Sequence, residues 1–312
     1  MKKPILIVIT GPTASGKSAL AVPLAKKLDT EIISADSRQI FKGIPIVTAV
    51  PSKIEQQNIK HHLLEILPLY SYYSASLFQE DALKILDQIF QNNDTAIICG
   101  GSMLYIDALL NGIDDLPTVP EEIRNSLTRD WNENGDLWLL ERLKEFDPDY
   151  YTKVDLKNLK RVFHAVEISI TAGKPYSNLL TGRKNLKELP FEVRKVCLDG
   201  QREELFNRIN TRVLSMMDNG LEEEAREVYH LRNYNSLNTV GLKEMFSYFD
   251  GVFTKEEAIA RIQKNTRVYA KKQLTWHKRD KNLNYLDFTT PIEKNIDIIL
   301  RLIDNKKIGK KI

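Results

Sequence analysis

Short apolar runs alternate with amphipathic stretches over the first hundred residues of the chain. Residues 5–9 are all Ile, Leu or Val and meet a glycine loop, which predicts a strand buried on both faces. Residues 31–34, which lead to Asp36, and residues 95–99, which lead to Gly100 and Gly101, predict a second and a third strand. Because helical patterns separate these strands, we predict an α/β fold: a doubly wound parallel sheet flanked by helices, with ligands outside the carboxyl ends of the strands.

Two helices are predicted between these strands. Residues 19–28 are rich in Ala and Leu at helical spacing and follow the glycine loop directly. Ser76 and Gln79 form a capping-box pattern for a second helix that continues to about Phe90. Both helices fit the crossover connections that parallel strands require.

The pattern changes between residues 117 and 190, where runs typical of buried strands give way to amphipathic helices. The clearest helix begins near Asp155 and ends before Gly173 and Pro175, and its apolar stripe consists of Leu156, Leu159, Phe163, Val166 and Ile170. The opposite face of this helix is basic and carries Lys157, Lys160, Arg161 and His164. A returning strand at 193–198 and two long helices, to about His230 and over 255–276, follow.

These changes divide the chain into four parts. We expect the first part of the core over residues 1–116 and a helical insertion domain over 117–190. The second part of the core, with a basic helix, is expected over 191–290, and a C-terminal helix with a basic tail over 291–312.

Charge is uneven along the chain, although the whole chain of 312 residues has a net charge of only +3. From Lys264 onward there are 13 Lys and Arg residues against 5 Asp and Glu, which leaves −5 for the first 263 residues. Such an imbalance indicates a polyanionic partner for the basic part. The composition, with 42% hydrophobic and 28% charged residues, excludes a disordered or fibrous protein.

Neither cysteines nor apolar runs indicate export or a membrane. Cys99 and Cys197 are far apart in short apolar runs, which predicts buried, reduced thiols in a cytoplasmic protein. No run approaches the roughly 18 apolar residues of a membrane span, so no membrane partner is expected.

The glycine loop matches the phosphate-binding pattern G-x-x-x-x-G-K-[ST] between a strand and a helix. Its backbone N–H groups and the helix N-terminus favour an anion, Lys17 can reach between phosphates, and Ser18 can ligate Mg²⁺. The predicted phosphate-binding residues are Gly11, Pro12, Thr13, Ala14, Ser15, Gly16, Lys17 and Ser18.

The acid that P-loop nucleotidases use to hold Mg²⁺ and orient water is absent from the end of the third strand, which weakens an ATPase interpretation. Asp36, at the end of the second strand, can accept a proton from a nucleophile, although a role as a cap or beyond the first shell of Mg²⁺ fits equally well. Gly100 and Gly101 permit close approach of backbone to ligand. The Ser102 hydroxyl can bond a leaving oxygen or cap the following helix.

Two further basic features have less specific patterns. Arg208 and Arg212 share a helix face and can clamp a diphosphate, but solvated arginines fit the spacing better. The stretch 264–281 has seven basic residues and one acid with interleaved aromatics, which favours nucleic acid over a solvated face. His61 and His62 lack partner ligands at suitable spacing, so ordinary packing is expected there.

The motifs together resemble the tRNA dimethylallyltransferase (tRNA isopentenyltransferase) family. The matching segments occur in family order from residue 5 to about 285, namely residues 11–18, Ser34-Ala-Asp-Ser37, His61-His-Leu-Leu-Glu-Ile66, Gly100-Gly-Ser-Met-Leu-Tyr105, Asn238-Thr-Val-Gly-Leu-Lys-Glu244 and Thr266-Arg-Val-Tyr-Ala-Lys-Lys-Gln-Leu-Thr-Trp276.

The resemblance implies that the P-loop holds the diphosphate of dimethylallyl diphosphate, and that the acceptor is N6 of the adenosine 3′ of the anticodon, in tRNAs that read codons beginning with U. It implies Asp36 as general base, Ser102 beside the oxygen between prenyl carbon and diphosphate, and Lys17 and Arg212 as cations that neutralise the leaving diphosphate. Ser18 would hold Mg²⁺.

The resemblance also implies contacts with the anticodon stem-loop, partly from the insertion domain. The implied tRNA-binding residues are Asp36, Ser37, Arg38, Gln39, Ser102, Arg124, Lys160, Arg161, His164, Gly241, Lys243, Lys271, Lys272 and Lys278. A monomer is expected. The alternatives are a P-loop small-molecule kinase, which would consume ATP, and a noncatalytic tRNA-binding paralogue.

Some positions depart from the family pattern. Ser102 stands where threonine is usual, and Lys160 and His164 replace the more usual glutamine and arginine. Further departures, which remove a glycine, a lysine and a tyrosine, are at Val47, Val50 and Leu242. These changes leave the proposed chemistry intact, and whether they alter the tRNA set or the rate stays open.

Overall fold

The computed structural model describes residues 3–114, 116–180 and 188–304. The chain divides into two compact units, one formed by Met1–Leu110 with Glu188–Ile312 and the other by Asn111–Lys187. We refer to them as the sheet unit and the helical unit. The predicted basic tail, at 305–312, lies outside the described residues.

The sheet unit is built on six parallel strands in the order β3-β2-β4-β1-β5-β6. They are β1 (Ile5–Thr10), β2 (Ile32–Ser34), β3 (His61–His62), β4 (Thr95–Cys99), β5 (Glu192–Asp199) and β6 (Asn284–Asp287). The central strand β1 pairs with both β4 and β5, and Ile9 lies between Cys99 and Val196 in register. Every residue of β1 is buried, as its uninterrupted apolar pattern predicts.

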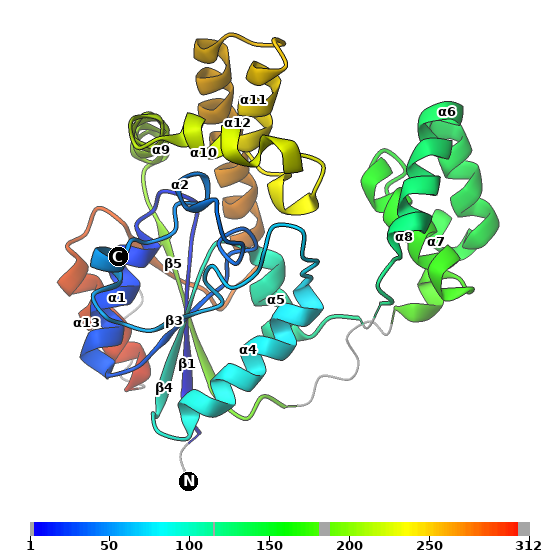
Figure 1. The fold of residues 1–312 in the computed structure, drawn as a ribbon. Helices are drawn as coiled ribbons and strands as arrows, with labels where there is room; N and C mark the ends of the chain where they lie inside the picture. The colour runs from blue at the N-terminus through cyan, green and yellow to red at the C-terminus, as the bar shows by residue number, and fades with distance from the viewer. Residues whose placement is uncertain (1–2, 115, 181–187, 305–312) are drawn as a thin grey trace. The chain divides into compact units, whose positions relative to one another are not determined.

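Helices cover both faces of this sheet (Figure 1). Helices α1 (Lys17–Leu28) and α13 (Ile292–Ile303) lie on one face, and α4 (Ala75–Phe90) and α5 (Met103–Asn111) lie on the other. Apolar side chains of β1, α1 and α13, including Ile7, Leu24 and Ile299, form the main core. The predicted doubly wound α/β fold is thus confirmed.

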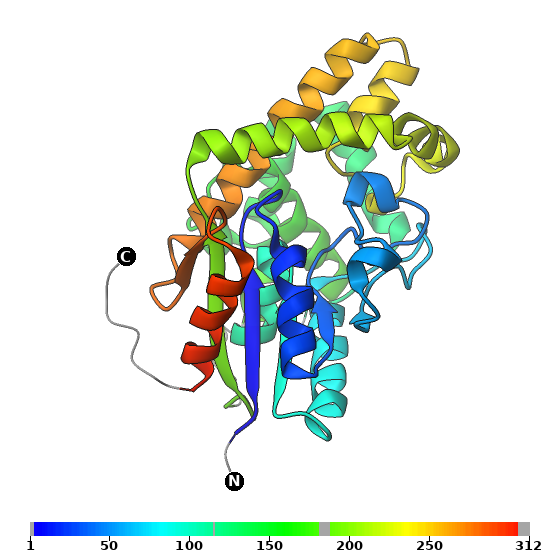
Figure 2. The same ribbon diagram turned by 90° about the vertical axis from the view of Figure 1, so that its left-hand side faces the viewer.

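The carboxyl ends of the strands are covered by a second group of helices (Figure 1). These are α9 (Arg202–Asp218), α10 (Leu221–Val228), α11 (Leu242–Phe249) and α12 (Lys255–His277), together with the short turns η2 (Tyr229–Leu231) and η3 (Asn235–Leu237). Helix α9, yellow-green, runs across this end of the sheet (Figure 2). Two short helices, α2 (Pro45–Thr48) and α3 (Lys53–Gln56), lie in the connection between β2 and β3.

Three local predictions need correction. Helix α4 begins at Ala75, with Ser74 accepting a hydrogen bond from Leu77 N at 3.2 Å, so the capping box predicted at Ser76 and Gln79 is wrong. The strands β3 and β6 are not predicted, because runs of two and four residues at a sheet edge leave little apolar periodicity. In β3, the His62 Nε2 atom forms a hydrogen bond with Glu31 Oε2.

The helical unit contains α6 (Glu121–Phe146), α7 (Pro148–Tyr151), α8 (Leu159–Ala172) and η1 (Tyr176–Leu179). Helix α6 is broken at Gly135, where φ is 79°. Helix α8 begins at Leu159, after an Asn158 cap, rather than near Asp155. Phe163 and Ile170 are only partly buried and lie at the edge of the core. The buried residues of α8 are Val162, Ala165, Val166, Glu167, Ile168 and Ser169.

A fully buried carboxylate organises the turn after α6. Asp147 accepts hydrogen bonds from Tyr150 N at 2.9 Å, from Ser177 N at 2.6 Å and from Ser177 Oγ at 2.8 Å. These bonds offset the cost of burying the charge and fix η1 against α7. Within the described ranges, no helix is both long enough and apolar enough to cross a bilayer.

Candidate active site

The P-loop joins β1 to α1, and its backbone geometry requires glycine at two positions. A Cβ on Gly11 would lie 2.5 Å from Leu198 O, and Gly16 has φ of +86° at the start of α1. Lys17 Nζ donates to Gly11 O at 3.1 Å and to Pro12 O at 2.8 Å. Burial lowers the pKa of Lys17. The ammonium therefore lies folded over the loop, ready to exchange its carbonyl partners for phosphate oxygens.

Two hydroxyls of this loop suit an anion and a hard metal ion. Ser15 Oγ is a buried side-chain oxygen that finds no hydrogen-bond partner among the described residues. Ser18 lies in the first turn of α1 and lines the same cavity as Lys17. No group of three His, Cys, Asp or Glu side chains suited to a metal occurs in the part of the chain that the structure describes. A single hydroxyl fits Mg²⁺, which usually keeps several waters and binds substrate phosphates.

Asp36 follows β2 at its carboxyl end. Its Oδ1 accepts hydrogen bonds from Arg38 N at 2.9 Å and Gln39 N at 3.3 Å, so the carboxylate does cap a turn, as the structural alternative predicts. The second oxygen, Oδ2, makes no hydrogen bond to the described residues. The side chain lines a cavity with Arg212 and Tyr269. Burial, with the charge of Asp36, raises the pKa of Tyr269 to about 12.

Ser102 and the two glycines before it connect the third predicted strand to Asp36. Ser102 Oγ accepts from Ser37 N at 2.8 Å, so this hydroxyl holds the turn after β2 and keeps its own proton available as a donor. A Cβ on Gly100 would lie 2.1 Å from Ala35 O, and one on Gly101 would lie 2.6 Å from Gln273 Nε2. These glycines therefore allow close approach within the protein itself, and because both also line the larger cavity, approach to a ligand there stays a prediction.

Of the two helical arginines, only Arg212 faces the loop. Arg212 Nη1 lies 3.4 Å from Thr13 Oγ1, and burial lowers its pKa while the charge of Asp36 opposes that effect. Arg208 instead pairs with Glu204 at 3.0 Å and covers the ring of Phe288. The structure therefore places Arg212 beside the loop and Arg208 on the cavity wall, although solvated arginines fit the sequence spacing better than a clamp.

Two adjoining cavities, of about 320 and 1160 Å³, meet at Asp36. The larger extends over the P-loop to Ser18, and the smaller extends between Val47 and Gly241. Both are lined by Thr13, Ala14, Asp36, Thr48, Arg212, Met216 and Tyr269. An anion on the P-loop and a second molecule in the smaller cavity would therefore meet beside the Asp36 carboxylate.

Arg38 and Gln39, both predicted to bind tRNA, donate hydrogen bonds to backbone segments next to the two cavities. Arg38 donates to the carbonyl oxygens of Asn235, Ser236 and Asn238 at 2.6, 3.1 and 3.3 Å. Gln39 Nε2 donates to Thr48 O at 3.0 Å and Ala49 O at 2.9 Å. Their side chains thus position the segments that reach Gly241 and Val47.

The basic stretch on α12 divides into two faces. Arg267 bonds Asn210, and Lys271 lies 5.5 Å above the ring of Phe206, so these two residues face α9. Lys272 and Lys278 are exposed, as is Lys243 at the start of α11. The cations of the stretch 264–281 are therefore divided between residues that contact α9 and exposed residues such as Lys272 and Lys278.

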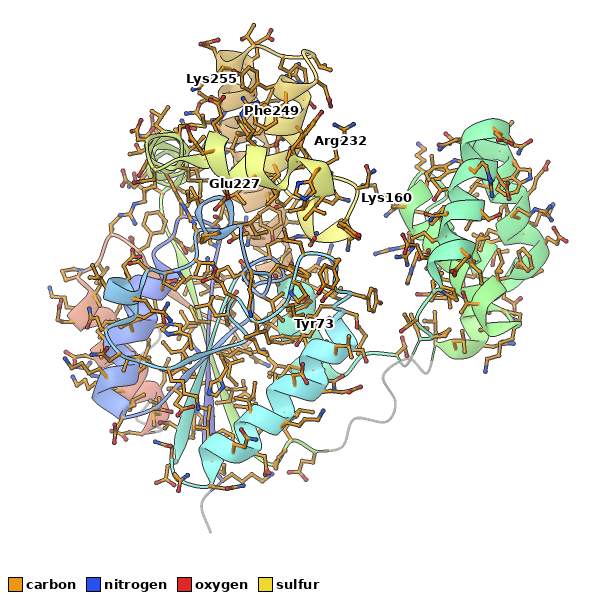
Figure 3. The ribbon with its side chains drawn as sticks, in the orientation of Figure 1. Tyr73, Lys160, Glu227, Arg232, Phe249 and Lys255 are labelled. Atoms are coloured by element: carbon orange, nitrogen blue, oxygen red, sulfur yellow. The ribbon has the colours of Figure 1, made fainter. Side chains whose placement is uncertain are left out.

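In the helical unit the predicted RNA contacts have different surroundings. Arg124 Nε bonds the buried carboxylate of Glu167 at 2.9 Å, and His164 Nδ1 bonds the same carboxylate at 2.9 Å. Lys160 and Arg161 are exposed, and Lys160 projects from α8 (Figure 3). Arg124 and His164 therefore support the fold of this unit, whereas the other two are free to meet a phosphate backbone.

Of the departures at Val47, Val50 and Leu242, Val47 lines the smaller cavity and Val50 the larger one. A Cβ on Gly241, where φ is +102°, would lie 2.3 Å from Val47 Cγ2. Val50 N donates to Pro45 O at 2.9 Å and closes the turn of α2. Leu242 is wholly buried in α11, so it fills the core rather than the cavity.

Three buried polar residues at the site were missed by sequence reasoning. Glu224 accepts from Ile46 N and Val47 N at 2.7 and 2.8 Å and holds the start of α2. Gln273 bonds the P-loop, and His277 Nε2 lies 3.4 Å from Thr10 Oγ1. Burial lowers the pKa of His277 to about 4, which keeps it neutral. The available signal is the spacing of Gln273 and His277, which lie one turn apart on a helix that the sequence analysis interprets through its charged and aromatic residues.

Comparison with known proteins identifies the family. A family model described as IPP transferase matches residues 39–280. The chain belongs to this IPP transferase family. This family member is 45% identical to tRNA dimethylallyltransferase 2 of Azobacteroides pseudotrichonymphae over 97% of this chain and 98% of the relative. It is 48% identical to tRNA dimethylallyltransferase 2 of Parabacteroides distasonis over 90% and 93% of the two chains. The resemblance predicted from the motifs is confirmed.

Solved structures give the same family. The full-length tRNA isopentenylpyrophosphate transferase of Bacillus halodurans superimposes with a TM-score of 0.72 at 33% identity, over 97% of both chains. A eukaryotic dimethylallyltransferase, crystallised in a study of its action on tRNA, gives a TM-score of 0.81 at 26% identity, over 99% of this chain and 81% of that one.

Proposed function

We propose that this IPP transferase transfers the dimethylallyl group of dimethylallyl diphosphate to N6 of the adenosine 3′ of the anticodon, in tRNAs that read codons beginning with U. The products are N6-(dimethylallyl)adenosine and diphosphate. The observation that carries the proposal is the position of Asp36, at the junction between a cavity over a P-loop and a second cavity.

The cavity residues divide the chemical work. Asp36 accepts the proton of N6 while N6 forms a bond to the prenyl carbon and the bond from that carbon to the diphosphate oxygen breaks. Ser102 donates its hydroxyl proton toward that oxygen. Lys17 and Arg212, both partly buried cations that line the larger cavity, stabilise the negative charge that grows on the departing diphosphate. Charge stabilisation in this partly water-excluded cavity is stronger than it would be in bulk water.

Mg²⁺ is the cofactor that the loop fits. Ser18 would hold the ion together with water and diphosphate oxygens. When bound, the ion supplies further neutralisation of the diphosphate charge. We propose no other metal ligand from this chain.

The acceptor base has to leave the stack of the anticodon loop to reach Asp36, as in other enzymes that modify bases. We propose that Lys243, Lys272 and Lys278 of the sheet unit, with Lys160 and Arg161 of the helical unit, contact the RNA backbone. The enzyme is expected to act as a monomer in the cytoplasm. Site residues that would be unnecessary for binding alone, Lys17 and Arg212 among them, favour an enzyme over a noncatalytic paralogue.

The test is transfer of labelled dimethylallyl groups to undermodified tRNA by the purified protein. We expect Mg²⁺-dependent label in RNA, located at one adenosine by nucleoside mass spectrometry. The proposal fails if no label enters RNA. ATP consumption without tRNA would instead indicate a kinase, and tight tRNA binding without product over long incubation would indicate the noncatalytic paralogue.

A further inference from the structure

A buried amide on α12 joins the two loops that carry the diphosphate-binding groups. Gln273 is 1% exposed. Its Oε1 accepts from Thr13 N at 2.9 Å, and its Nε2 donates to Gly101 O at 3.0 Å. One side chain therefore bridges the P-loop and the β4–α5 loop. In sequence, Gln273 is 260 residues from Thr13 and 172 residues from Gly101.

The bridge leaves little freedom on either side. A Cβ on Gly101 would lie 2.6 Å from Nε2, so a glycine is needed for the amide to reach the carbonyl. Thr13 is held twice, because its hydroxyl lies 3.4 Å from Arg212 Nη1 while its N–H is bonded by Gln273. A shift of α12 is thus carried directly to the backbone of the P-loop and to the residue before Ser102.

Helix α12 also carries surface that faces outward. Lys272 precedes Gln273 and is exposed, and Lys278 follows the helix and is exposed. Tyr269, one turn earlier, lines both cavities. Helix α12 therefore carries residues proposed to contact RNA, a residue that lines both cavities, and Gln273, which forms a hydrogen bond with the P-loop.

We propose that Gln273 is a positioning residue that couples the two substrates. RNA bound along α12 fixes the helix, Gln273 then fixes the Thr13 N–H and the Gly101 carbonyl, and the diphosphate binds a loop that is already in place. Because coupling between two binding sites is reciprocal, bound diphosphate strengthens RNA binding by the same factor. This inference rests on the proposed function, since it assumes RNA on α12 and a diphosphate on the P-loop.

The test measures the dissociation constant of an anticodon stem-loop RNA with and without saturating dimethylallyl thiolodiphosphate, whose carbon–sulfur bond resists cleavage. We expect the analogue to tighten RNA binding of the wild type by about fivefold or more, the lower end of typical coupling. In Gln273→Met, which keeps the length of the side chain and removes both hydrogen bonds, we expect a factor below about twofold. RNA affinity without the analogue should stay within about threefold.

Gln263→Met is the matched control, since Gln263 lies on the same helix and its amide donates to Asn210 O at 3.3 Å rather than to the P-loop. It should keep the wild-type factor. If Gln273→Met does not fold, Gln273→Glu keeps an acceptor for Thr13 N–H, loses the donor to Gly101 O and should also lose coupling. A wild-type factor of one, or unchanged coupling in a folded Gln273 variant, overturns the inference. Prenyl transfer by the wild type, measured separately, shows whether the proposed function fails as well.

Discussion

Two substitutions of Asp36 distinguish its role in proton transfer from its role in stabilising the turn after β2. Its Oδ1 accepts two backbone hydrogen bonds, from Arg38 N and Gln39 N. Asp36→Asn keeps an oxygen for both bonds and removes the charge and the capacity to accept a proton at neutral pH. Asp36→Ala removes the two bonds as well. The pair of variants therefore distinguishes a general base from a residue that only caps the turn.

The expected magnitudes differ between the two properties. Loss of a general base slows the chemical step by about 10²–10⁴, so both variants should lose at least about 10² in single-turnover rate. A backbone hydrogen bond contributes about 0.5–1.5 kcal/mol net. Two such bonds make the free energy of unfolding about 1–3 kcal/mol lower for Asp36→Ala than for Asp36→Asn. tRNA affinity should change little in either variant.

The assay is rapid-quench single turnover with preformed enzyme–tRNA complex and labelled dimethylallyl diphosphate, alongside denaturant unfolding and RNA binding. Asp199→Asn is the matched control, because Asp199 also lies at the carboxyl end of a strand, as the last residue of β5, accepts from Gly200 N at 2.8 Å and lines neither cavity. A rate for Asp36→Asn within tenfold of the wild type would refute the general-base role. Lost RNA affinity at an unchanged single-turnover rate would assign Asp36 to binding.

Three further predictions concern charge and backbone. RNA affinity should fall steeply with salt, and Lys272→Ala should reduce the slope by about one phosphate contact, whereas a flat response contradicts the basic surface. Burial raises the pKa of Glu167, but hydrogen bonds from His164 and Arg124 outweigh this and hold it below 4.5. The stabilisation is therefore complete above pH 4.5 and lost as pH falls through the lowered pKa. The melting temperatures of the wild type and Glu167→Gln should therefore converge as the pH falls. A difference in melting temperature that does not change with pH would contradict this prediction. Gly241→Ala should lower the free energy of unfolding by about 1–3 kcal/mol in denaturant, through its positive φ and contact with Val47. Adding Val47→Ala should recover only the contact part.

Features that depend on a few neighbouring residues were predictable from the sequence. The P-loop, the strands β1 and β4 and the place of Asp36 at a strand end follow from local apolar runs and glycine spacing. The sequence predicts Ser76 as the N-cap of α4, whereas the structure uses Ser74, because the two serines offer equivalent local signals. Propensity alone does not choose between two such serines.

Contacts between distant segments were not predictable in the same way. Gln273 meets Thr13 across 260 residues of sequence, and Glu224 meets Ile46 across 178. The charges of the stretch 264–281 favour nucleic acid for the stretch as a whole, yet Arg267 within it bonds Asn210 of α9. One sequence shows that a side chain is polar, and only the fold shows whether water, RNA or another helix meets it.

The place of β5 in the sheet has a consequence for synthesis of the protein. Strand β1 pairs along its whole length with β5, which is made about 180 residues later. At about 5–20 residues per second, the ribosome needs roughly 10–40 s to add the missing strand. The helical unit is continuous in sequence and complete by then, whereas β1 still lacks a partner at the edge that β5 will cover. The nascent chain therefore passes through a stage at which a chaperone, or a pause in translation, would protect it from aggregation.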